Sequence, residues 1–407
     1  MSRAKDEEVH LYDAAVVGAG PTGLAAALAL NYVGADVVLI GPPPERRDTR
    51  SAALLAGSID MLKAIGAWSR LAEHAAPLRA IRIVDASQSL LKGPDTTFEA
   101  TELGLEAFGY NIPNTILVDT LYARAKEALS AVVATNVRNL AIGEQLATLE
   151  LSEGSPVAAR LVVGADGRQS LCREAAGIST SKWRYEQSAL ATDFCHVFPH
   201  DDISIELHRE AGSVTTVPLP DPHASSLIWV GPTAEIATLM RQDAETFRES
   251  LQERLGGLLG RISETGARAN FLIAGLTAAT LATNRTALIG EAAHILPPIG
   301  AQGLNLGLRD AASLADCVAA ALRRHDDPGS EEVLAAYRAT RHLDVLTRTV
   351  GVDLLSRSLL SSFVPIQAAR GLVLHGLNAL PPLRRMVMRL GLTPPTELPS
   401  LMRPAVN

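Results

Sequence analysis

The chain has 407 residues, of which 47% are hydrophobic, and a formal net charge of −7 at pH 7. This length allows one large or two modest domains, and the apolar content is sufficient for a full buried core. The negative charge and the lack of a basic face argue against a nucleic-acid-binding protein.

The cysteines and the first residues indicate the compartment. Cys172, Cys195 and Cys317 are scattered and lack the spacing of metal ligands, so we expect structural thiols, a reducing compartment and no metal site. Residues 1–10 are charged and contain no apolar signal region. No uninterrupted apolar run is long enough to cross a bilayer. We therefore expect a cytoplasmic protein, and a peripheral position on a membrane stays open.

The first predicted unit is a strand, a glycine-rich turn, a helix and a second strand. Apolar residues 14–17 and 37–40 predict the strands, and the Ala/Leu-rich residues 24–30 predict the helix. Between them, residues 18–23 read Gly-Ala-Gly-Pro-Thr-Gly, a G-x-G-x-x-G turn. In this context the turn predicts a dinucleotide site, because glycines let the backbone approach a pyrophosphate closely.

The acidic residue that often binds the ribose of a dinucleotide is missing from the end of the second strand. Gly41 stands there, and three prolines follow it. Glu45 or Asp48 could loop back to take the place of this acid, or the ribose could be bound in another way.

The middle of the chain predicts a return to the same sheet and then a second sheet. We expect a helix near residues 118–130 and strands near 138–151 and 157–164. The last strand runs into the turn Gly164-Ala165-Asp166-Gly167, which taken alone is an ordinary Asp-Gly turn. Short alternating strands over 188–231 predict a separate sheet, and residues 244–258 predict a helix.

A third segment completes the pattern. A strand over residues 286–289 is followed by the loop Gly290-Glu291-Ala292-Ala293-His294-Ile295-Leu296-Pro297-Pro298 and by a long helix from about Gln302. The start of a helix exposes backbone N–H donors and favours an anionic group. An electron-rich cofactor ring that becomes anionic on reduction would suit this position.

These three motifs, in this order and spacing, resemble those of the FAD-dependent aromatic hydroxylases of the p-hydroxybenzoate hydroxylase-like superfamily. Within it, the chain is most similar to the ubiquinone-biosynthesis hydroxylases. The closer likeness lies in four stretches: residues 50–68, 183–190, 302–310 and 353–384. The resemblance extends over residues 11–392, nearly the whole chain.

The resemblance implies an α/β fold with interleaved domains. A Rossmann-like FAD-binding domain would consist of residues 11–78, 105–187 and 279–350. A substrate-binding β-sheet domain would consist of residues 79–104 and 188–278. Residues 351–407 would form a helical C-terminal region.

The resemblance also implies the roles of individual residues. The residues expected to bind FAD are Gly18, Gly20, Pro21, Thr22, Gly23, Arg50, Asp166, Gly167, Gly290, Glu291, Pro298, Gly303, Leu304 and Asn305. Glu291 replaces the Asp that most relatives use to bind the ribityl hydroxyls. Pro298 and His294 are the candidates for direct catalytic roles, with a structural role as the main alternative for His294.

The implied activity is hydroxylation of an aromatic ring. NAD(P)H would reduce FAD, the reduced flavin would capture O₂ as a C4a-hydroperoxide, and the distal oxygen would pass to the ring of a polyprenyl phenol in ubiquinone biosynthesis. Only one G-x-G-x-x-G turn is present, so NAD(P)H would bind transiently or a protein would donate the electrons. Two alternatives remain: a flavin monooxygenase of a soluble aromatic compound, and a non-catalytic FAD-binding scaffold of a biosynthetic complex.

The C-terminal region leaves two interpretations open. Residues 351–407 contain six arginines against only Asp353 and Glu397, with apolar clusters between them. They would form either a helical cap on the core or a surface that contacts a membrane or a biosynthetic complex. The sequence also leaves open whether the chain forms a homo-oligomer.

Overall fold

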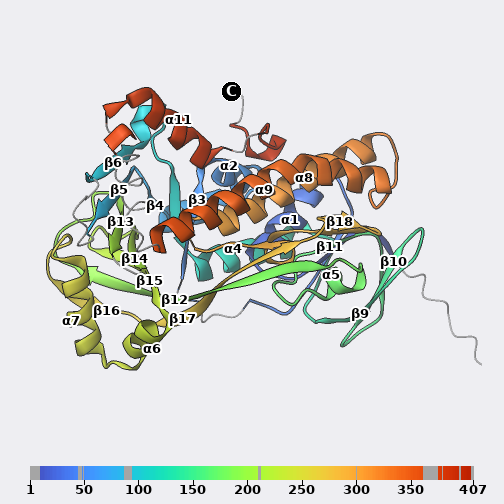
Figure 1. Ribbon diagram of the computed structural model, residues 1–407. Helices are drawn as coiled ribbons and strands as arrows, with labels where there is room; N and C mark the ends of the chain where they lie inside the picture. Colours follow the sequence, from blue (N-terminus) through green and yellow to red (C-terminus); the bar gives the residue numbers. More distant parts are fainter. Residues whose placement is uncertain are drawn as a thin grey trace, which may run out of the picture.

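The computed structural model describes residues 10–44, 48, 50–86, 94–209, 212–298, 300–360, 375–377, 379–393 and 396–404, with only the backbone for 355–360. Glu45, Arg370 and residues 1–9 lie outside these ranges. Figure 1 shows two sheets side by side, with helices packed around both.

The first sheet has a parallel centre. Its strands lie in the order β18 (Ala282–Thr283), β19 (Thr286–Leu288), β11 (Val157–Gly164), β1 (Leu11–Val17), β2 (Val37–Ile40) and β8 (Ala131–Val133), with β10 (Ala147–Leu151) beside β11 and β9 (Val137–Ile142) beside β10. β1 is parallel to both neighbours. In this register Ala15 lies opposite Val162 of β11 and Val38 of β2. The turns that follow these strands therefore meet at one edge of the sheet.

The second sheet is mostly antiparallel. Its order is β20 (His294–Ile295), β17 (Ala269–Ala278), β12 (Thr180–His196), β15 (Ala224–Pro232), β14 (Gly212–Pro218), β13 (Ile203–Arg209), β5 (Ala80–Asp85) and β6 (Thr96–Glu99), and β16 (Ile262–Thr265) also pairs with β12. A third, small sheet consists of β3 (Ser51–Leu55), β7 (Gly109–Pro113) and β4 (Ala76–Pro77).

Helices cover the sheets. They are α1 (Pro21–Tyr32), α2 (Ala56–Ala64), α3 (Trp68–Leu71), α4 (Asn114–Ala128), α5 (Leu171–Ala175), α6 (Thr233–Arg241), α7 (Ala244–Leu255), α8 (Gln302–Arg323), α9 (Glu331–Leu360) and α11 (Pro381–Leu392), with short 3₁₀ turns η1 (Ala72–His74), η2 (Ala100–Leu103), η3 (Gly290–Ala292) and η4 (Ser400–Met402).

The helix α1 is apolar on all sides and is enclosed by other elements. Every residue from Gly23 to Leu30 is buried, and α1 packs against α4 and α8 as well as β2. This packing belongs to the main core around the first sheet. A second core lies between the second sheet and the helices α6 and α7, and includes Phe194, Trp229 and Phe247.

The structure extends several predicted elements. β12 begins at Thr180, so residues 180–184 already pair with β17 in the second sheet, and the strand continues across a bulge between Arg184 and Ser188. Local sequence gave no sign of this continuity, because the pairing partners of these residues lie in β17, far along the chain. Residues 80–85 and 96–99 form β5 and β6 at the edge of the second sheet, and α6 precedes the predicted helix at 244.

The thiols of the buried Cys172 and the half-buried Cys317 are kept protonated by their surroundings. Burial, and then the nearby Asp166 carboxylate, raise the pKa of Cys172 well above its usual range. Burial, with a smaller effect of Asp316, raises the pKa of Cys317 to about 11.

Neither a membrane-crossing segment nor a metal cluster is found in the described part of the chain. No helix there is both long and apolar enough to span a bilayer. No three His, Cys, Asp or Glu side chains there come together as the ligands of a metal ion would.

Candidate functional site

A cleft of about 730 Å³ opens at the carboxyl ends of β1, β2 and β11. It is lined by the predicted residues Gly18, Gly20, Pro21, Arg50, Asp166 and Gly167. Other residues that line the cleft carry no recognisable sequence motif, among them Asn114, Thr115, Asp119, Thr135 and Asn136, which come from α4 and from the segment after β8. A cleft at this edge of a parallel sheet is a common place for a nucleotide.

Two glycines bring the backbone segments of the cleft together. Gly18 has a φ of +114°, and a Cβ there would collide with the carbonyl of Ala165 in the neighbouring turn. A Cβ on Gly23 would collide with the carbonyl of Gly18. The two turns after β1 and β11 therefore touch through their backbones, which only glycine permits.

Gly41 is part of the same close packing. A Cβ there would lie 2.6 Å from the amide nitrogen of Ala19. The position that could have carried the ribose-binding acid therefore has no room for any side chain. Of the two carboxylates proposed as substitutes, Asp48 lines the cleft, and Glu45 lies outside the described residues.

Other glycines face open space. Apart from adjacent residues and the backbone of the same helix, a Cβ on Gly20, Gly167 or Gly303 would meet no atom of the described residues within 4 Å. The packing of the protein itself does not require glycine at Gly20 or Gly303, since neither has a positive φ. A bound group that lies against the backbone would explain a glycine at both positions.

Two buried acceptor atoms at the cleft have no hydrogen-bond partner in the part of the chain that the structure describes. Asp166 accepts a hydrogen bond from the amide of Cys172 through Oδ2 at 3.0 Å, but its Oδ1 has no partner among the described residues. The Oδ1 atom of Asn114 is likewise unpaired. Because buried polar atoms are rarely left unsatisfied, these two acceptors fit the hydroxyl groups of a ligand.

Arg50 and Asp48 form a charged pair at the mouth of the cleft. Arg50 donates to both carboxylate oxygens of Asp48, at 2.8 and 2.7 Å, and Asn114 donates to the same carboxylate at 3.0 Å. Burial alone would raise the pKa of Asp48, but these hydrogen bonds outweigh it and lower the pKa. The Asp48 carboxylate therefore remains ionised, and the positive charge of Arg50 at the cleft is accompanied by this negative charge.

The loop after β19 does not line the cleft, but it packs against the two motifs that do. The Glu291 carboxylate is half exposed and bonded to Arg168, with Nε–Oε2 and Nη2–Oε1 distances of 3.1 and 3.3 Å. Thr22 packs beneath this loop, since its side chain limits the space at both Gly290 and Gly307. The third motif is thereby brought against the first two.

The start of α8 follows this loop. Ala301 precedes the helix in the left-handed conformation, and no side chain caps the first turn. Gly303 is exposed, whereas Leu304 packs against the main core. Gln302 and Asn305 are buried in the same turn, so the uncapped start of this long helix is open mainly at Gly303, where it is suited to a group that carries partial negative charge.

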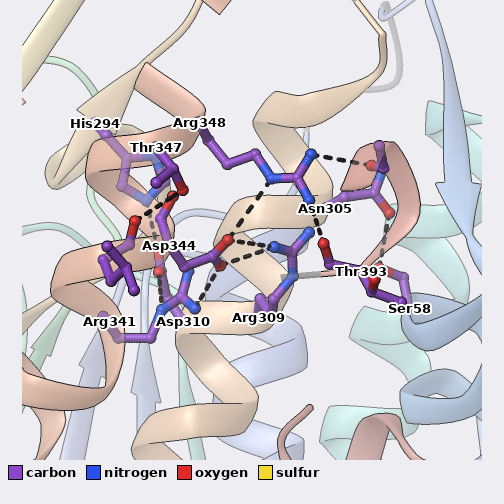
Figure 2. Close-up of polar contacts among 12 residues, drawn as sticks. Ser58, His294, Asn305, Arg309, Asp310, Arg341, Asp344, Thr347, Arg348 and Thr393 are labelled. Carbon is purple, nitrogen blue, oxygen red and sulfur yellow. Dashed lines mark hydrogen bonds and ion pairs between the residues drawn. The ribbon is translucent and has the colours of Figure 1, made fainter. Parts of the chain in front are cut away.

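Asn305 is fully engaged within the protein. Its Oδ1 accepts from the Leu55 amide at 2.8 Å and from Ser58 Oγ at 2.7 Å, and its Nδ2 donates to the carbonyls of Ala53 and Ala301. Figure 2 shows the contact with Ser58. The side chain ties α8 to the β3–α2 segment, so only the backbone of Asn305 is available to a ligand.

The two candidates for catalysis are placed differently. Pro298 is exposed near the start of α8, while His294 is buried, with its Nε2 2.6 Å from Asp310 Oδ2. Arg173 has a structural role that its sequence context does not indicate. This buried side chain donates to the carbonyls of Ala292 and Arg168, at 2.8 and 2.9 Å, and so links the second and third motifs.

Comparison with known proteins agrees with this geometry. The FAD binding domain family matches residues 11–350. The ubiquinone hydroxylase UbiL of Rhodospirillum rubrum is 34% identical over 404 residues, which cover 96% of this chain and 92% of the relative. The 3-demethoxyubiquinol 3-hydroxylase of Escherichia coli is 30% identical over 390 residues, which cover 93% of this chain and 97% of the relative.

Solved structures show the same fold. The p-nitrophenol 4-monooxygenase PnpA of Pseudomonas putida matches with a TM-score of 0.76 at 18% identity, over 94% of this chain and 98% of that one. The predicted α/β fold of the p-hydroxybenzoate hydroxylase type is thereby confirmed. The chain belongs to the FAD binding domain family and, with the ubiquinone hydroxylases among its relatives, is an FAD-dependent monooxygenase of the aromatic hydroxylase type.

Proposed function

We propose that this enzyme hydroxylates the aromatic ring of a polyprenyl phenol in ubiquinone biosynthesis, with O₂ as the oxygen source and NAD(P)H as the transient reductant. The observation that carries the proposal is the identity of 34% to a ubiquinone hydroxylase along 96% of the chain. When bound, FAD would supply the redox chemistry and the activation of O₂.

The cleft residues have separate tasks in this proposal. Gly18, Gly20 and the start of α1 would lie against the pyrophosphate, and Arg50 would contribute positive charge. The unpaired Oδ1 of Asp166 would accept a hydrogen bond from a cofactor hydroxyl. The backbone around Gly303 and Pro298 would border the flavin ring, with Glu291 near the ribityl chain.

We also propose the domain division that the resemblance implies. Residues 11–78, 105–187 and 279–350 would form the FAD-binding domain, 79–104 and 188–278 the substrate domain, and 351–407 the C-terminal region. Most strands of the second sheet support this division, although β12 begins at Thr180 and β20, at residues 294–295, also belongs to this sheet.

The substrate gives a reason for the exposed C-terminal helix. α11 carries Arg385 and Arg389 and no acidic residue, and four large apolar side chains are exposed on it: Leu383, Met386, Val387 and Leu390. A polyprenyl phenol dissolves in lipid. We therefore propose that α11 contacts an anionic membrane surface, since basic and apolar side chains together suit such a surface.

Deletion of the gene tests the proposed reaction. Mass spectrometry of lipid extracts should show a polyprenyl phenol that lacks one hydroxyl group, and the wild-type gene should restore the quinone. An unchanged quinone profile, together with a purified yellow protein that oxidises NAD(P)H only with a water-soluble aromatic compound, would favour a soluble substrate. A colourless protein that takes up no added FAD would favour a scaffold.

A further inference from the structure

Beneath the loop of residues 290–295, α8 and α9 bury a cluster of charged side chains (Figure 2). Arg309 donates to both oxygens of Asp344 at 2.8 and 2.7 Å. Arg341 joins the two carboxylates, with 2.8 Å from its Nε to Asp310 Oδ1 and 2.7 Å from its Nη1 to Asp344 Oδ2. Both carboxylates have no exposed surface, and Arg341 is 1% exposed.

The second oxygen of Asp310 holds both ends of the loop. Asp310 Oδ2 accepts the amide hydrogen of Gly290 at 3.1 Å and lies 2.6 Å from Nε2 of His294. Gly290 starts the loop in the left-handed conformation, and His294 ends it in β20. Glu291, the proposed ribityl contact, lies between these two anchor points.

The direction of the His294 bond follows from its partner. Burial raises the pKa of Asp310, but the charges of His294 and Arg341 and the hydrogen bonds outweigh it and lower the pKa. Asp310 is therefore an acceptor, and Nε2 of His294 carries the hydrogen. The other ring nitrogen, Nδ1, has no partner among the described residues.

A cluster of this kind is poorly explained by stability alone. Removing charges from water is costly, and well-packed apolar side chains of similar volume often stabilise a core equally or better. The charged groups add directional hydrogen bonds. With one oxygen of its carboxylate held by Arg341, Asp310 can accept hydrogen bonds from the Gly290 amide and the His294 ring in only one arrangement.

We propose that Asp310 and His294 are positioning residues for the cofactor loop. Asp310 fixes the Gly290 amide and the His294 ring and thereby sets where Glu291 stands. His294 serves as a hydrogen-bond donor to Asp310 and not as a proton donor in the reaction. The inference rests on the proposed FAD site, since only a bound flavin gives the position of the loop a consequence.

Two matched substitutions test the role of Asp310. Asp310→Asn and Asp344→Asn each remove one buried carboxylate beside Arg341, but only Asp310 contacts the loop. We expect both to lower the melting temperature of the apo-protein. Asp310→Asn should also weaken FAD binding about tenfold or more and shift the visible absorption bands of the bound flavin, while Asp344→Asn should change FAD affinity less than about threefold.

The readouts are titration of the apo-protein with FAD, followed by flavin fluorescence, and the absorption spectrum of the complex. Equal FAD affinity and equal spectra in the two variants would overturn the inference. If the wild-type protein itself binds no FAD, the proposed cofactor site fails instead, so the two failures are distinguishable.

His294 provides a second test in case Asp310→Asn does not fold. The Nε2 of a glutamine can donate to Asp310 as the imidazole Nε2 does, whereas a leucine cannot. His294→Gln should keep FAD affinity, flavin spectrum and turnover within about threefold, and His294→Leu should weaken FAD binding about tenfold. Loss of turnover in His294→Gln, with binding and spectrum intact, would make His294 a proton donor and overturn the inference.

Discussion

The glycines of this protein fall into two groups, which differ in whether a Cβ would collide with a neighbouring atom. Gly18, Gly23 and Gly41 are required by contacts within the protein, because a Cβ at each would collide with a neighbouring backbone atom. Gly20 and Gly303 have no such neighbour among the described residues, so a bound group could occupy the space beside them. Substitutions at the two kinds of glycine should therefore have different consequences.

Gly41 and Gly20 make a matched pair for this difference. Gly41→Glu restores the acid of other dinucleotide sites, yet it should destabilise the apo-protein and weaken FAD binding, since its Cβ would lie 2.6 Å from the Ala19 amide nitrogen. Gly20→Ser should leave the apo-protein stable, because serine is a favoured residue before a helix, while FAD affinity falls about tenfold. Urea unfolding and FAD titration measure both. A Gly41→Glu protein that is stable and binds FAD more tightly would contradict this account.

The start of α8 offers a second contrast. Gly303→Val should change the unfolding free energy of the apo-protein by less than about 1 kcal/mol, because a Cβ there approaches no other described residue within 4 Å and valine is no worse than glycine in a helix. Hydroxylation should be lost, because the branched side chain would occupy the place of the flavin. Gly307→Val, one turn later, is the control: it should impair folding, since its Cβ would lie 2.9 Å from Thr22 Oγ1. An active, FAD-replete Gly303→Val enzyme would show that the flavin does not approach this turn.

At the scale of elements, α8 and α9 are joined by charge as well as by apolar packing. The cluster around Asp310 also reaches α11, because Arg348 lies 3.6 Å from Asp344 and donates to the carbonyls of Gly391 and Thr393 at 3.0 and 2.7 Å. One network of ion pairs and hydrogen bonds thus connects the cofactor loop, two long helices and the end of the C-terminal helix (Figure 2).

This cluster predicts an acid sensitivity. The pKa of Asp310 in the folded protein is lowered, whereas an aspartate in an unfolded chain has a pKa of about 3.9. Its contribution to stability is therefore complete well above pH 3.9 and is lost as the pH falls below that value toward the folded pKa. Between pH 6 and pH 3, the melting temperature of Asp310→Asn should fall less than that of the wild type. Parallel curves for the two proteins would mean that Asp310 does not contribute to the acid sensitivity.

At the scale of the whole molecule, α11 is both attached and exposed. Arg384 is paired with Glu102 at 2.7 Å, and Met388 packs against Phe98 and Phe108 in a small core of its own. The opposite side of α11 keeps its arginines and apolar side chains exposed. Both interpretations from the sequence, a packed cap and a docking surface, are therefore compatible with one helix.

The docking surface makes a testable prediction. Each basic residue near an anionic membrane contributes roughly 1 kcal/mol, so Arg385→Glu with Arg389→Glu should reduce co-sedimentation with anionic liposomes, most strongly at low salt. The control is Arg138→Glu with Arg323→Glu, which changes the net charge equally at exposed positions on β9 and α8. If both double variants and the wild type sediment alike, α11 is not a membrane-contacting surface.

The sequence by itself determined the parts of this protein that depend on short-range pattern. The G-x-G-x-x-G turn between apolar strands, the Asp-Gly turn after β11 and the loop before α8 all lie where local spacing predicted them. Their order along the chain was sufficient to identify the family, because each turn needs particular residues at fixed local offsets.

Only the tertiary structure decided how these segments meet. Asn305 bonds to Leu55, 250 positions away in sequence, and Asp310 binds Gly290 and Arg341 on different elements. The tertiary structure also shows that Gly41 has no room for a side chain and that β12 begins as early as Thr180. Such contacts join residues that are distant in sequence, and they depend on close packing, which local propensity and spacing do not encode.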